Sequence, residues 1–124
     1  MPDTKLLPKL IERLITHTSE GKIDWTETAS EDDFQAPVAQ NVVTVSRSRN
    51  SENWDAWDYR IAVADRNGAL LDEARDGDFG PNVNIAKRTP YEALSSLYAA
   101  ARRSARKVDQ ALADMIASLD SLKS

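Results

Sequence analysis

Cysteine is absent from this chain of 124 residues, and histidine occurs only once. Without cysteine the chain can form no disulfide, no thiolate zinc site and no cysteine nucleophile. The single histidine, His17, leaves the commonest transition-metal ligand sets incomplete within one chain. The sequence therefore predicts no metal and no cofactor, and we expect His17 to be capped or to face solvent near the end of a helix.

Long apolar runs are also missing. No stretch approaches the roughly 18 apolar residues of a membrane-spanning helix, and the mean hydropathy is -0.52. Near the N-terminus the apolar residues are interrupted by Lys9, Glu12 and Arg13, unlike the apolar segment of a secretion signal. We expect a cytoplasmic location and no contact with a membrane.

Motifs that carry a known chemistry are not recognisable. With four glycines in the chain, no glycine-rich phosphate loop and no Gly-x-Ser-x-Gly elbow has the required spacing. Residues 76–80 read Asp-Gly-Asp-Phe-Gly, but the twelfth position counted from Asp76 is Lys87, where a calcium loop needs glutamate. Carboxylates at 31–33 and at Asp55 and Asp58 fall in predicted turns or strand edges. The sequence thus favours a non-enzymatic protein and leaves an enzyme as a third alternative.

Size and charge indicate one domain with an uneven charge distribution. A chain of this length buries enough surface for a single core. Residues 1–80 contain 16 Asp and Glu against 9 Lys and Arg, whereas residues 81–124 contain 4 against 7. A net charge of -4 is unusual for a dedicated nucleic-acid binder, although a local basic stripe could still bind one.

The first predicted element is a helix over residues 4–19. Asp3 or Thr4 is a suitable cap and Gly21 a suitable end. Apolar pairs repeat every four residues and so lie along one side of this helix, at Leu6/Leu7, Leu10/Ile11 and Leu14/Ile15.

An antiparallel sheet is predicted over residues 22–75, where the apolar period changes to two. Four to five short strands begin near Ile23, Phe34, Val42, Trp57 and Ala69. The polar run 47–53 predicts a mobile hairpin loop, and Asn67-Gly68 predicts a tight hairpin turn. Trp25 and Trp57 are in phase with buried strand positions, so we expect them to pack in the core. A loop over 76–88 follows.

The last predicted element is one long amphipathic helix over residues 89–122. Thr89, Pro90 and Glu92 form a strong helix start. Apolar residues then recur at alternating spacings of four and three, which is a heptad pattern, at Leu94, Tyr98, Ala101, Ala105, Val108, Leu112, Met115, Leu119 and Leu122. The predicted fold is therefore α+β, with an N-terminal helix, an antiparallel meander, and this helix packed on one sheet face.

The predicted helix is longer than the domain that carries it. At about 1.5 Å per residue it measures roughly 50 Å, whereas a compact domain of this size is about 35 Å across. Unless the helix breaks, its last turns need cover from the first helix or from a second chain. We therefore expect a homodimer whose contacts are Leu112, Met115, Ile116, Leu119 and Leu122.

Five further residues are candidates for binding a partner. Trp54 borders the polar loop, and an exposed indole there would suggest a contact. Arg102, Arg103, Arg106 and Lys107 form a basic block that suits a phosphate or an acidic partner. The sequence nevertheless favours for this block a solvated flank that pairs with acidic residues of the sheet, because the first 80 residues supply that negative charge.

Parts of the sequence resemble a group of short uncharacterised bacterial proteins. The residues that carry the resemblance are Trp25-Thr26-Glu27-Thr28, Phe34, the run 59–63 with its Asn67-Gly68 turn, and the run Leu97-Tyr98-Ala99-Ala100-Ala101-Arg102-Arg103-Ser104-Ala105. The resemblance implies a bacterial cytoplasmic protein of shared fold, and it assigns no catalytic or binding residue.

Together these patterns favour a small protein-interaction or regulatory module that acts through its C-terminal helix. The alternative is a nucleic-acid-binding accessory protein that uses the basic stripe of the same helix.

Overall fold

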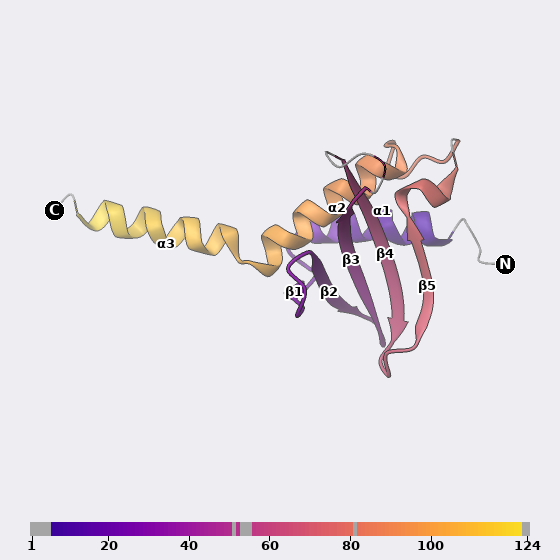
Figure 1. Ribbon diagram of the computed structural model, residues 1–124. Coiled ribbons are helices and arrows are strands. Elements are labelled where there is room, and N and C mark those ends of the chain that lie inside the picture. The colour runs from indigo at the N-terminus through magenta and orange to yellow at the C-terminus, as the bar shows by residue number, and fades with distance from the viewer. Residues whose placement is uncertain (1–5, 51, 53–55, 81, 123–124) are drawn as a thin grey trace.

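The computed structural model describes residues 6–50, 52, 56–80 and 82–122. Its antiparallel sheet consists of β1 (Thr26–Glu27), β2 (Asp33–Val38), β3 (Asn41–Arg49), β4 (Trp57–Asp65) and β5 (Leu70–Arg75), paired in that order. Helices α1 (Leu6–Ser19) and α2 (Pro90–Ala105) cover one face of the sheet, and α3 (Val108–Ser121) extends away from it (Figure 1). The predicted α+β class is confirmed.

Alternation along the strands explains why the helices lie on one face only. Every second residue of β2, β3 and β4 points into the core, and the largest of these are Phe34, Val43, Val45, Tyr59 and Ile61. The intervening residues are mostly polar, as expected where one face of an antiparallel sheet meets water. From the helices, Ile11, Leu94 and Leu97 close the same core.

The contact between α1 and the chain that follows it differs from the prediction. Residues 22–25, predicted to be part of a strand, are not in one, and β1 begins only at Thr26. Trp25 is nevertheless buried, at 3% exposure, and its Nε1–H donates to Oγ1 of Thr18, on the last turn of α1, at 2.9 Å. This hydrogen bond explains how the polar side chain of Thr18 comes to be buried on α1.

Strand β3 is longer than its apolar run. Arg47 to Arg49 were predicted to belong to a mobile loop, but they pair with β4, with Arg47 opposite Tyr59 and Arg49 opposite Trp57. The prediction was wrong because it treated polarity as a loop signal, whereas the end of a strand beside the helix layer can keep charged side chains half in solvent.

Residues 76–88 also contain more structure than the predicted loop. A short 3-10 helix, η1 (Asp76–Phe79), follows β5 directly. Ile85 forms an isolated bridge with Arg88 and is 1% exposed, so it anchors the loop to the core. The start of α2 agrees with the prediction: Thr89 Oγ1 accepts from the Glu92 backbone N–H at 3.2 Å, and the Glu92 carboxylate accepts from the Thr89 backbone N–H at 3.2 Å.

The predicted helix over 89–122 is divided into two at Arg106 and Lys107. Lys107 adopts a left-handed conformation, with φ 52° and ψ 45°, so the α-helix cannot continue through it. Two like-charge pairs four residues apart, Arg102 with Arg106 and Arg103 with Lys107, disfavour an unbroken helix here. The break also brings Asp109 within 3.0 Å of Arg103 Nε.

Helix α3 is therefore not packed on the sheet. Among the described elements it contacts α2 alone, and none of its residues is buried. No helix in the described part of the chain is long and apolar enough to cross a membrane.

Candidate functional site

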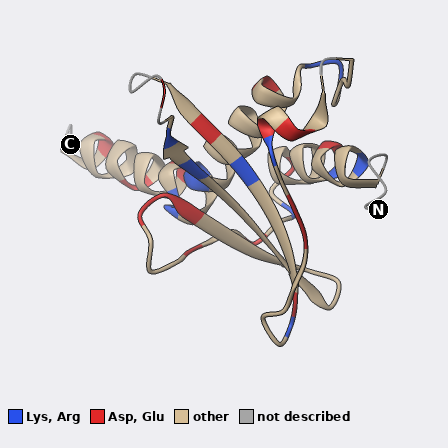
Figure 2. Ribbon diagram, turned by 45° about the vertical axis from the view of Figure 1, so that its right-hand side comes forward, with Lys and Arg blue, Asp and Glu red and all other residues tan. Residues whose placement is uncertain are grey.

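Four arginines line a groove where α2 meets α3. The groove has a volume of about 480 Å³ and lies between α2, β3, β4 and the first residue of α3. We call it the arginine groove, and it is lined by Arg47, Tyr59, Ser95, Tyr98, Ala99, Arg102, Arg103, Arg106 and Val108. Lys and Arg segments gather at this junction in Figure 2.

Arg47 brings the sheet into the groove. It follows Val43 and Val45 on the helix-facing side of β3, and its Nε donates to Asp32 Oδ1 at 3.2 Å. Its guanidinium carbon lies 4.1 Å from the ring centroid of Trp57 and 5.0 Å from that of Tyr98. These cation–π contacts fix the position of a side chain that would otherwise be mobile.

The basic block at the end of α2 and in the break that follows contains two paired and two unpaired side chains. Arg103 binds Asp109 of α3, and Arg106 Nε donates to Glu27 Oε1 on β1 at 3.1 Å. The side chains of Arg102 and Lys107 have no hydrogen bond or ion pair to any other described residue. The predicted pairing with acidic residues of the sheet therefore holds for Arg106, and Arg102 remains available for a ligand.

Tyr98 forms the floor of the arginine groove. It is 3% exposed, and its ring packs edge-on against Phe34 with the centroids 5.5 Å apart. Its hydroxyl is buried and makes no hydrogen bond within the described part of the chain. Burial raises the pKa of the Tyr98 hydroxyl, and the positive charge of Arg47 opposes that rise. The hydroxyl consequently stays protonated at neutral pH and has an unused donor.

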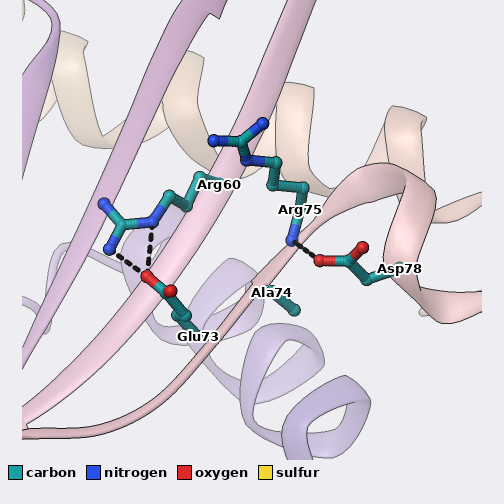
Figure 3. Close-up of a pocket in the computed structure, with 5 residues that line it drawn as sticks. All are labelled: Arg60, Glu73, Ala74, Arg75 and Asp78. Atoms are coloured by element: carbon teal, nitrogen blue, oxygen red, sulfur yellow. Dashed lines mark hydrogen bonds and ion pairs between the residues drawn. The ribbon is translucent and has the colours of Figure 1, made fainter.

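A second pocket, of about 290 Å³, lies beside β4 and β5 and is shown in Figure 3. Its lining contains two arginines and two carboxylates, so its charges balance: Arg60 Nε donates to Glu73 Oε2 at 2.8 Å, and Asp78 Oδ2 accepts from the neutral backbone N–H of Arg75 at 2.8 Å. These partners leave little unbalanced charge to attract a ligand.

Two of the other acidic candidates have structural partners, and Asp55 lies outside the described residues. Asp76 accepts from the backbone N–H of Tyr59 at 3.0 Å, and Asp58 accepts from Asn50 Nδ2 at 3.0 Å. Among the described residues no three His, Asp or Glu side chains are close enough to share a metal ion. His17 lies half-exposed in the last turn of α1, with Nδ1 3.2 Å from Glu20 Oε1.

The predicted oligomer contacts are brought together on one side of α3. Their exposed fractions are high: Leu112 43%, Met115 53%, Ile116 59%, Leu119 62% and Leu122 77%. Val108 begins the same apolar row and lines the arginine groove. Trp54, the remaining candidate, lies outside the described residues.

Sequence reasoning missed Arg47 and placed Tyr98 in the buried row without assigning a role to its hydroxyl. Arg47 was placed in a loop, although its two-residue spacing from Val43 and Val45 is a signal for the helix-facing side of β3. Tyr98 was placed in the heptad row, and that row indicates burial without showing that the hydroxyl lacks an acceptor.

Comparison with known proteins yields no match to a protein family, to a curated protein or to a solved structure.

Proposed function

We propose that the protein is a non-enzymatic interaction or regulatory module that pairs with a second copy of itself through α3. The observation that carries this proposal is the row of five large apolar side chains on a helix that the domain leaves uncovered. Contiguous exposed apolar surface of this kind is typical of a binding site.

The length of α3 supports the need for a partner. Isolated helices shorter than about 12–15 residues have marginal stability in water, because forming the first turn is unfavourable and each further residue adds only a little stability. Helix α3 has 14 residues and contacts only α2 among the described elements. A second helix packed along its apolar row would supply the tertiary contacts that stabilise it.

The exposed apolar area of α3 is consistent with a second copy as that partner. From the exposed fractions, burying the five side chains of both copies removes on the order of 1,000 Å² from solvent, near the lower limit of a specific interface. The same apolar row on both copies also makes a self-complementary contact, which a two-fold dimer requires.

Leu119→Asp tests this proposal. A charge in the middle of the apolar row should weaken dimerisation strongly, because an unpaired carboxylate would have to be buried. Ala117→Asp is the matched control: Ala117 lies two residues away, on the opposite side of α3. Light scattering should show monomers for Leu119→Asp and dimers for Ala117→Asp and the unmodified chain. Equal masses for all three would reject the proposal.

A nucleic-acid-binding accessory protein is the second candidate. It is favoured by Arg102 and Lys107, whose side chains lack partners in the described part of the chain. The pairing of Arg103 and Arg106 with acidic residues argues against it, because a long polyanion must be met by unpaired cations. A filter-binding assay distinguishes the two candidate functions, because nucleic-acid binding must weaken steeply as the salt concentration rises.

A further inference from the structure

We propose that the arginine groove is a binding site for a small phosphate ester. The proposal rests on the lining of the groove and does not depend on dimerisation through α3.

The lining differs from that of the other pockets in its charge. Four of its nine residues are arginines and none is acidic. Three other pockets each contain acidic lining residues, Glu73 and Asp78 in one, Glu27 and Glu31 in another, and Asp33 and Asp58 in the third. Three of these arginines, Arg47, Arg103 and Arg106, form ion pairs with carboxylates outside the lining, so the excess positive charge of the groove comes from Arg102.

Acidic residues around the groove hold its arginines in place. Asp32 accepts from Arg47 Nε at 3.2 Å, and Glu27 accepts from Arg106 Nε at 3.1 Å. Neither carboxylate lines the groove. A guanidinium held through Nε keeps its terminal amino groups as donors, and a positioned guanidinium loses less entropy when it binds an oxyanion.

Unused donors remain in the groove as well. The Arg102 side chain has no hydrogen bond or ion pair with any described residue. The Tyr98 hydroxyl is buried without an acceptor, which is unfavourable for a polar group and calls for an explanation. The hydroxyl oxygen is covered in this conformation, so a phosphate oxygen would supply the missing acceptor once the Tyr98 ring shifts toward the groove.

Charge and size together define the ligand class. A phosphate monoester has a charge of about -1.5 to -2 at neutral pH and three acceptor oxygens, which suits several guanidinium donors better than a single carboxylate does. The volume of about 480 Å³ falls within the range of small-molecule sites. The ring of Tyr59 and the side chains of Ala99 and Val108 provide apolar walls for the rest of the ligand.

Titration of the intact protein with three probes tests the site: adenosine monophosphate, inorganic phosphate and adenosine. Calorimetry at low ionic strength, followed by amide chemical shifts, should show binding of the two phosphate-bearing probes and none of adenosine. Arg102→Gln should weaken binding about tenfold or more, and Tyr98→Phe about threefold to tenfold, because each removes a donor to an anion. Arg66→Gln is the control: this exposed arginine lies in the turn between β4 and β5, at the far end of β4 from Tyr59.

Three results would overturn the proposal. The first is no phosphate binding at millimolar concentration. The second is binding that Arg102→Gln and Tyr98→Phe leave unchanged while both variants remain folded by circular dichroism. The third is a single-stranded oligonucleotide that binds far more tightly than the mononucleotide, which would assign the groove to a nucleic acid. Leu119→Asp should retain phosphate binding, so failure of the dimer and failure of this site are distinguishable.

Discussion

At the scale of single residues, buried polar atoms show where the fold depends on one particular side chain. Trp25 and Thr18 form such a pair, since the indole N–H of the buried tryptophan has its acceptor on the last turn of α1. The pair connects α1 to the chain entering β1. Loss of the acceptor would leave a donor buried without a partner.

We expect Thr18→Val to lower the free energy of unfolding by about 1–3 kcal/mol, the usual cost of a buried donor without an acceptor. Thr18→Ser keeps a hydroxyl and should cost less. Urea unfolding followed by tryptophan fluorescence measures both variants. Equal losses for Val and Ser would show that the methyl group of Thr18 matters and the hydrogen bond does not.

The start of α2 should give the domain a stability that depends on pH. Hydrogen bonds from the backbone and side chain of Thr89 lower the pKa of Glu92 below its usual value. A lowered carboxylate pKa stabilises the fold above the unfolded value, near pH 4.5, and this contribution is lost as pH falls through the folded value. Thermal unfolding between acid and neutral pH should therefore depend on pH less for Glu92→Gln than for the unmodified chain. Parallel curves for the two proteins would contradict this role.

The residue scale is also where prediction from sequence was least complete. Burial of Trp25 followed from its alternation with polar neighbours, but the hydrogen bond to Thr18 could not, because it depends on how α1 is placed. In the same way, Arg102 and Arg106 were found as members of a basic block. Their neighbour Arg47 comes from a strand more than 50 positions earlier, and only the fold brings it to them.

At the scale of elements, periodicity predicted the sheet and helices well and the break in the last helix poorly. The heptad row runs through Ala105 and Val108 without a glycine or proline between them, so apolar spacing alone indicates one helix. The structure ends α2 at Ala105, because Lys107 takes a left-handed conformation that charge repulsion and the Arg103–Asp109 pair favour.

Removal of α3 should leave the domain folded. A chain that ends after Lys107 should unfold at a temperature close to that at which the domain unfolds in the intact chain, since none of the residues of α3 is buried. A chain that ends after Leu97 loses Tyr98 and Ala101 from the core and should not fold. Differential scanning calorimetry compares the two. If the chain that ends after Lys107 were unfolded, α3 would have to stabilise the domain in a way that its contacts do not reveal.

At the scale of the whole molecule, the body of the domain buries its own apolar side chains, whereas α3 needs a partner to do so. The sheet, α1 and α2 enclose a continuous core, whereas α3 extends beyond it with its apolar row in solvent (Figure 1). The length estimate from sequence anticipated this overhang, although it assumed an unbroken helix. What covers the row could not be predicted, because the sequence of one chain does not specify its partner.

The mass of the intact chain in solution tests the central claim most directly. Multi-angle light scattering at micromolar concentration and above should give twice 13.8 kDa, the mass of one chain, because a second copy covers the apolar row of α3. The mass should fall toward that of one chain on dilution, with a midpoint that reports the dissociation constant. A mass of 13.8 kDa at every concentration would contradict pairing of two copies through α3.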